Sequence, residues 1–101
     1  MCNRSEFFLR RDQIALGALA GFPVANAQAC LDFCVLDLNC VGVDFDYVAI
    51  LYCWPHYTAN AYQENNIYSQ PGTNSYQLLT RCAPTGWFFH YVYISSHMKI
   101  S

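Results

Sequence analysis

The chain has 101 residues, of which 54% are hydrophobic and 12% are charged, and its formal net charge is −2. This balance is the opposite of that found in disordered chains. Five Lys and Arg residues in total are too few for the basic stripe of a nucleic-acid-binding protein, so we expect no nucleic-acid partner. The length predicts one domain, and a domain of this size buries only about 60–65% of its unfolded surface, so it needs extra stabilisation.

Targeting signals are not visible in the chain. The longest apolar run is residues 87–94, far short of the roughly 20 residues of a membrane-spanning helix, so we expect no membrane-spanning segment. No apolar signal-peptide region follows Met1. We therefore expect a fragment or excised domain of a secreted protein, or of the extracellular face of a membrane protein, because the cysteines indicate an oxidising compartment.

The first half of the chain predicts a short strand, a loop and one helix. Residues 7–9 form an apolar β-type run, and residues 15–23 are small and interrupted by glycine, which predicts a compact loop. Asn26 is a good N-cap and few helix breakers follow it. We therefore expect an α-helix over about 26–36.

After the helix, apolar residues alternate with Gly42, Asp44 and Asp46. This period of two predicts a half-buried strand with its apolar side in the core and its carboxylates in solvent. The apolar side consists of Val41, Val43, Phe45 and Tyr47.

The second half of the chain predicts a hairpin and one further strand. Residues 48–50 are expected to form the hairpin turn, and residues 51–54 return as its second strand. From residue 55 to residue 74 the chain is polar, and Pro71-Gly72 marks a turn. Residues 76–82 are predicted to be the last strand.

Six cysteines in a short chain indicate a disulfide framework, for which arithmetic alone leaves 15 pairings. They are Cys2, Cys30, Cys34, Cys40, Cys53 and Cys82. Cys30 and Cys34 lie one turn apart on the predicted helix. Their side chains project in parallel, so each is expected to pair with a cysteine elsewhere rather than with the other.

A zinc site is the alternative use of these residues, since His56 follows Cys53 closely. Structural zinc sites usually present two tight cysteine knuckles, and here only Cys30 and Cys34 have that spacing. Zinc also leaves Cys2 and Cys82 unexplained. We therefore expect disulfides, no metal and no cofactor.

The cysteine pattern resembles the PAN/apple family of disulfide-rich extracellular modules. Three segments carry the likeness, which covers residues 2–82: Cys30-Leu31-Asp32-Phe33-Cys34, Cys40-Val41-Gly42-Val43-Asp44-Phe45 and Tyr76-Gln77-Leu78-Leu79-Thr80-Arg81-Cys82. The resemblance implies an α+β fold, a curved antiparallel β-sheet packed against a single α-helix. It also implies three disulfides, Cys2–Cys82, Cys30–Cys53 and Cys34–Cys40. Residues 83–101 have no counterpart in the family and form a C-terminal tail of unknown role.

Catalytic motifs are not found. Asp44 and Asp46 share a strand face, which permits an acid–base pair or a Ca²⁺ site, but a solvated strand face is the simpler interpretation. The three histidines, His56, His90 and His97, are dispersed, and none has a nucleophile at a diagnostic spacing. We expect no enzyme.

Ligand recognition is predicted on the segment 54–68, which mixes aromatic and amide side chains. Such mixtures stack and form hydrogen bonds with sugars or with protein surfaces. The candidates are Tyr57, Tyr62, Tyr68, His56 and Asn60, whereas Trp54, next to Cys53, is expected in the core. We expect an extracellular adhesion or recognition module that binds a protein or a carbohydrate. The alternative is a structural or oligomerisation module of a larger extracellular protein.

Two further features concern the chain termini. Asn3-Arg4-Ser5 is an N-glycosylation sequon, which fits a secreted glycoprotein. A Cys2–Cys82 bridge would gather four arginines, and these either bind an anionic glycan or are simply solvated. They are Arg4, Arg10, Arg11 and Arg81.

Overall fold

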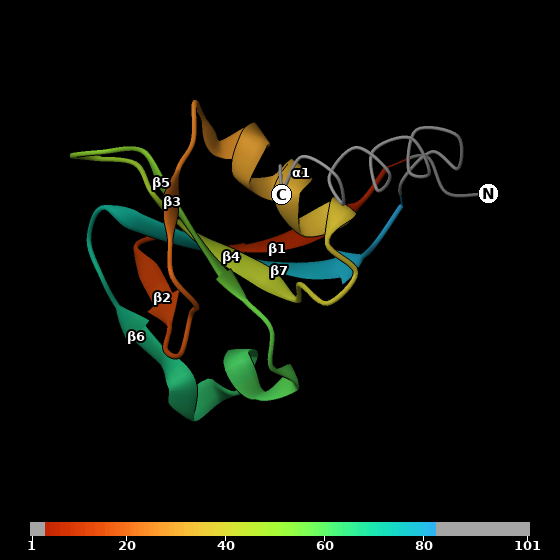
Figure 1. The fold of residues 1–101 in the computed structure, drawn as a ribbon. Helices are drawn as coiled ribbons and strands as arrows, with labels where there is room; N and C mark the ends of the chain where they lie inside the picture. The colour runs from red at the N-terminus through yellow and green to blue at the C-terminus, as the bar shows by residue number, and fades with distance from the viewer. Residues whose placement is uncertain (1–3, 83–101) are drawn as a thin grey trace.

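The protein is an α+β domain with one α-helix and two antiparallel sheets in the computed structural model, which describes residues 4–82 (Figure 1). Its elements run in the order β1 Glu6–Arg10, β2 Gln13–Ala15, β3 Phe22–Pro23, α1 Ala27–Leu36, β4 Gly42–Asp46, β5 Tyr52–His56, the 3₁₀ helices η1 Ala59–Tyr62 and η2 Glu64–Asn66, β6 Ile67–Ser69 and β7 Thr73–Thr80. This is the fold class expected from the sequence.

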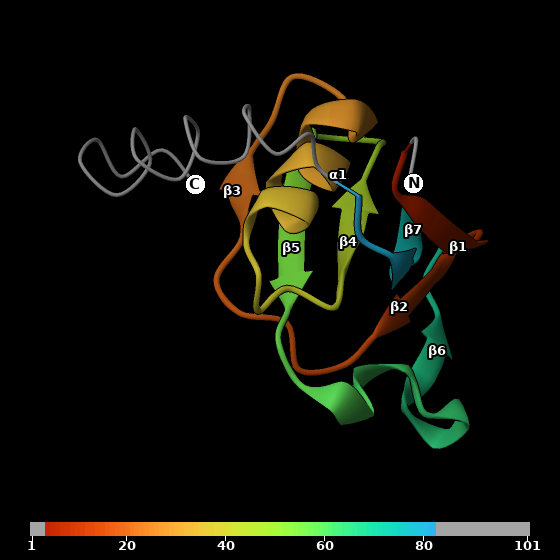
Figure 2. The ribbon, with the colours of Figure 1, turned by 90° about the vertical axis from the view of Figure 1, so that its right-hand side faces the viewer.

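The larger sheet has five strands in the order β1-β7-β4-β5-β3, and the smaller pairs β2 with β6. Helix α1 covers one face of the larger sheet, and β2, β6 and the 3₁₀ helices lie on the other side (Figures 1 and 2). We call the first the helix face, the second the back face, and the elements over the back face the second layer. Strand β4 is therefore central and covered on both sides.

Helix α1 begins and ends where local chemistry predicts. The Asn26 side-chain oxygen accepts a hydrogen bond of 2.9 Å from the backbone N–H of Ala29, the usual N-cap contact. At the other end, Arg81 donates to five backbone oxygens, those of Cys34, Val35, Asp37, Leu38 and Cys40. A cation suits the partial negative charge of a helix C-terminus. Arg81 thus fastens the end of β7 to the end of α1.

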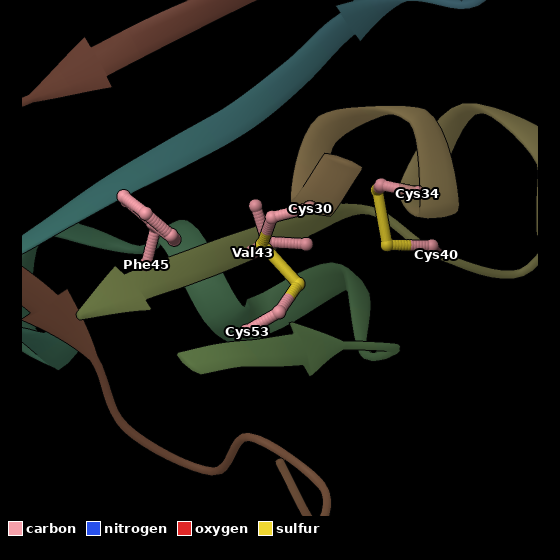
Figure 3. Close-up of a cluster of buried hydrophobic side chains, with 6 residues drawn as sticks. All are labelled: Cys30, Cys34, Cys40, Val43, Phe45 and Cys53. Carbon is pink, nitrogen blue, oxygen red and sulfur yellow. A yellow bond between two sulfur atoms is a disulfide. The ribbon is translucent and has the colours of Figure 1, made fainter. Parts of the chain in front are cut away.

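Two disulfides join α1 to the sheet side of the core (Figure 3). Cys30–Cys53 links the helix to β5, and Cys34–Cys40 links it to the residues before β4. These four cysteines, with Val43 and Phe45, form the buried cluster of the helix face. The prediction that the two helical cysteines pair elsewhere is confirmed, and none of the four sulfurs is a free thiolate for a zinc ion.

The two ends of the described chain lie side by side. The Cys2–Cys82 bridge implied by the family resemblance would place residues 7–9 beside residues 76–82. Strand β1 does pair with β7, with Phe7 opposite Leu78 and Leu9 opposite Tyr76. The Ser5 hydroxyl accepts from the Cys82 N–H at 2.7 Å. Cys82 is disulfide-bonded, whereas its predicted partner Cys2, the sequon at Asn3 and the tail 83–101 lie outside the described residues.

Several sequence-based boundaries are wrong. The stretch 15–23 is not only a loop, because Phe22–Pro23 forms β3 and pairs with β5. The polar segment 55–74 includes a strand, β6, which pairs with β2. Strand β7 begins at Thr73, directly after a turn in which Gly72 has φ 93°, a conformation that the predicted Pro-Gly turn requires at its glycine.

Removing the Cys30–Cys53 bridge should destabilise the protein more than removing Cys34–Cys40. The bridges span 23 and 6 residues, so chain entropy assigns them about 3.4 and about 2.2 kcal/mol. All four side chains are buried, so paired substitutions to alanine leave comparable cavities. Urea unfolding of C30A/C53A and C34A/C40A measures the difference, and an equal or reversed ranking would contradict the loop-length argument.

Candidate functional site

The polar interior of this protein lies on the back face. Residues opposite one another in antiparallel strands share a face, and Asp44 lies opposite both Trp54 and Ser75. Within residues 4–82, the buried polar residues all belong to this face: Asp44, His56, Thr73 and Ser75. The helix face has an apolar core of cystines, valine and phenylalanine, so the two sides of the sheet differ in chemistry.

The expectation that Asp44 lies on a solvated strand face is wrong, because only 4% of the residue is exposed. The second layer covers it, a feature that alternation along one strand does not reveal. Tyr47, expected in the core, lies beyond the end of β4 and is 41% exposed. Its hydroxyl donates instead to Asp12 at 2.5 Å.

Asp44 and His56 form a buried pair. His56 Nε2 lies 2.9 Å from Oδ2 of Asp44 and donates to it when that nitrogen carries the proton. The other carboxylate oxygen, Oδ1, accepts a long contact of 3.4 Å from the backbone N–H of Ala15. His56 Nδ1 is buried and has no hydrogen-bond partner within residues 4–82. Oδ1 of Asp44 therefore makes only one weak hydrogen bond.

Tyr62 from η1 closes the network over the back face. Its hydroxyl accepts from Ser75 Oγ at 3.1 Å and donates to the backbone oxygen of Tyr76 at 3.2 Å. Its ring meets His56 edge to face, at 5.6 Å between centroids. The ring lies directly on Gly42, where a Cβ atom would overlap it. Burial raises the pKa of Tyr62, and the Asp44 charge adds to the effect.

Asp44, His56 and Ser75 are the residue types of a hydrolytic triad, but their geometry is different. Ser75 Oγ donates to Tyr62, whereas a nucleophile needs its base within hydrogen-bond reach. Ser75 is also fully buried, so a substrate does not reach it in this conformation. These hydrogen bonds therefore fix the positions of Asp44, Ser75 and Tyr62 on the back face.

A pocket of about 260 Å³ opens beside this network. The sheet contributes Asp44, Trp54 and Thr73, and the other wall consists of Ile14, Ala15, Leu16, Gly17 and Ala18. The expectation that Trp54 is a core residue is wrong, because it is 38% exposed. Its neighbour Cys53 faces the helix, so Trp54 must face the back, where its ring packs over Gly21 and beside Tyr52.

Hydrogen bonds hold the outer wall of the pocket at both ends. The backbone N–H of Leu16 donates to the oxygen of Asn66 at 3.2 Å, and the Asn66 side chain returns a bond of 3.0 Å to the oxygen of Leu16. Three residues later, the N–H of Leu19 donates to the oxygen of Pro55 at 2.9 Å. The pocket is therefore built into the fold, as ligand sites usually are.

The five ligand candidates from the sequence do not share one surface. His56 and Tyr62 lie inside the back face. Tyr57 packs against the helix-face core, and its hydroxyl donates to Asp37 at 2.6 Å. Tyr68, on β6, and Asn60, on η1, are exposed.

The four arginines are not gathered into one patch. Arg10 lies on the back face, where it donates to Gln77 at 2.9 Å and stacks on the Phe8 and Tyr62 rings. Arg81 lies at the end of α1, on the other side of the sheet. Both guanidinium groups serve the fold.

Sequence reasoning missed the Asp44–His56 pair because it ended the second hairpin strand before Pro55. Proline is unfavourable in a central strand because it cannot donate to a neighbour. Strand β5 tolerates Pro55 because its other neighbour, β3, pairs only with Tyr52 and Cys53. Continuing the alternation past Pro55 places His56 opposite Gly42, on the face of Asp44. No pattern in the sequence indicated that residues 14–18 line the pocket.

No protein-family description, no curated protein and no solved structure matches this chain. Among residues 4–82, no helix is long and apolar enough to cross a membrane.

Alkaline pH should destabilise the protein through Tyr57 and Tyr62. Burial raises the pKa of both phenols, and the bond from Tyr57 to Asp37 adds to it. A raised pKa in the folded state means that the stabilisation is complete below the ordinary tyrosine pKa of about 10 and is lost as pH rises further. Absorbance at 295 nm should show these two phenols ionising above the ordinary tyrosine pKa.

The matched variants are Y62F and Y68F. Y62F should flatten the alkaline loss of stability, because phenylalanine has no phenol to ionise, and Y68F is the control for the removal of an exposed hydroxyl. Identical alkaline profiles for the two variants would show that Tyr62 titrates like a surface phenol.

Proposed function

We propose that this chain is an extracellular, non-enzymatic recognition module of the PAN/apple type that binds a protein or carbohydrate ligand in the back-face pocket. One observation carries the proposal. The pocket combines the part-exposed indole of Trp54 with the buried carboxylate of Asp44. Few polar groups set in a largely apolar concavity are typical of binding sites.

The disulfides support the extracellular part of the proposal. Structural disulfides persist in oxidising compartments and are rare in the cytosol. The two bridges between described residues, Cys30–Cys53 and Cys34–Cys40, are also the pairings that the PAN/apple resemblance implies. A small core held by covalent links can present a polar face for recognition without depending on that face for stability.

Replacement of Trp54 should abolish ligand binding. Disulfide-intact protein is first screened against immobilised extracellular-matrix proteins and glycans, and the ligand found is then titrated against W54A and Y68A by biolayer interferometry. W54A removes an aromatic wall of the pocket, and the loss of a central aromatic contact weakens binding at least about 30-fold. Y68A removes an exposed ring on β6 and should bind normally.

Thermal unfolding of both variants serves to check that they remain folded. If Y68A loses binding and W54A retains it, the ligand site lies on the exposed part of the segment 54–68 rather than in the pocket. If neither variant changes binding, the ligand contacts another face.

The β4–β5 hairpin favours a second candidate, a structural or oligomerisation module of a larger extracellular protein. The hairpin projects from the domain (Figure 1), and Val48 and Ile50 near its tip are 68% and 65% exposed. Neighbouring Leu51 and Tyr47 are partly exposed as well. Apolar side chains gathered at a projecting tip are typical of contact surfaces.

Under this second candidate, the chain should self-associate through the hairpin. Sedimentation velocity would show a sedimentation coefficient that rises with concentration, and V48S/I50S would abolish the rise. A substitution of similar size outside the hairpin, L79S on β7, is the control. A monomer at all concentrations would exclude self-association through this tip.

A further inference from the structure

We propose that the back-face pocket receives the ammonium group of a lysine side chain presented by a partner protein. The inference rests on the proposed function and narrows its ligand to one chemical class. It depends on three groups that line the pocket: the Asp44 carboxylate, the Trp54 indole and the Thr73 hydroxyl.

The charge of the pocket favours a cation. Asp44 is almost entirely buried, and its side-chain partner within residues 4–82 is His56, whose Nε2 lies 2.9 Å from Oδ2. The nearby guanidinium of Arg10 is held over the Tyr62 ring and bonded to Gln77. Asp46 lies two residues along the same strand face, about 7 Å further on, and adds a second negative charge.

The hydrogen-bonding capacity of Asp44 selects an ammonium group over a guanidinium group. Oδ2 is occupied by His56, and Oδ1 has only the long contact with Ala15. One oxygen with only a weak contact suits a compact point charge, whereas arginine binds carboxylates best through both oxygens at once. Thr73 lines the same pocket and is 8% exposed, and its hydroxyl has no hydrogen-bond partner within residues 4–82. It can accept a second N–H of the ammonium.

The walls of the pocket match an aliphatic stem. Ile14, Leu16 and the Trp54 ring surround the polar base with apolar surface, and an aromatic face also attracts a cation placed above it. A hexose presents several hydroxyls at once. Two polar side chains at the base would leave buried hydroxyls without partners, which costs free energy. The pocket therefore fits a charged group on an apolar chain better than a sugar ring.

Titration of the disulfide-intact chain followed by amide and indole NMR shifts tests the proposal. The probe is Nα-acetyl-lysine N-methylamide, in which the side-chain ammonium is the one charge. It should shift the Trp54 indole N–H and the Leu16 and Thr73 amides, with a dissociation constant of about 1 mM for a ligand of this size. The Nε-acetylated analogue, which keeps the stem without the charge, should not shift them.

Two substitutions with matched controls locate the binding groups. D44N should weaken binding at least about tenfold, since it removes a charged acceptor, and D32N, the same change on the exposed side of α1, should not. T73V should weaken binding about two- to tenfold, and T80V, at the exposed end of β7, should not. If D44N fails to fold, the T73V and T80V pair still decides whether the base of the pocket is used.

The outcomes separate this inference from the proposed function. If a methyl hexoside or the acetylated analogue shifts the pocket signals and the lysine probe does not, the pocket binds ligands but the lysine assignment is wrong. If Nα-acetyl-arginine N-methylamide binds as tightly as the lysine probe, the pocket does not select an ammonium group over a guanidinium group, and the lysine assignment is wrong. If no probe shifts these signals, the ammonium inference is overturned, while the partner screen with W54A still tests the proposed function.

Discussion

The Cys30–Cys53 bridge decides which side chains face which layer. A bridge to α1 requires that Cys53 point toward the helix, and strand alternation then turns Trp54 toward the back. Phe45 lies opposite Cys53 and shares its direction, which leaves Asp44 on the back face with Trp54. A slip of one residue would exchange the two sets. The covalent link therefore fixes the register that assembles the pocket.

As a consequence, the two faces of the larger sheet bury different kinds of side chain. The helix face holds the apolar cluster with both described disulfides, whereas the back face holds a buried ion-pair candidate, two hydroxyls and a phenol. Buried polar networks contribute little net stability, because desolvation offsets their hydrogen bonds. The domain can hold a polar network on its back face because the disulfides stabilise the helix face independently.

Local patterns predicted the helix side well. The N-cap at Asn26, the absence of helix breakers and the spacing of Cys30 and Cys34 are all short-range signals, and the structure has each of them. The pairing of β1 with β7 was expected from the Cys2–Cys82 bridge that the family resemblance implies. These features depend on residues that are close in the chain or covalently joined, which is why one sequence suffices to find them.

The back face was not predictable in the same way. Its second layer is made of strands of three residues and single turns of 3₁₀ helix, too short to leave a period in the sequence. Without that layer, Asp44 has the pattern of a solvent-facing carboxylate. Its burial follows from contacts with Ala15 and His56 that are 29 and 12 residues away along the chain.

The separation of the two sides has a further physical consequence for recognition. Hydrogen bonds between Leu16 and Asn66, and from the Leu19 N–H to the oxygen of Pro55, hold the loop around Leu16, and the Tyr62 ring packs against His56. A ligand entering the pocket thus meets groups that are already ordered, so little conformational entropy is lost on binding. Since the cross-links lie on the other face, an exposed side chain in the outer wall of the pocket, such as Leu16, can change with little effect on the fold. Under the proposed function, the specificity of the pocket would be set by its few polar groups, among which Asp44 is the carboxylate.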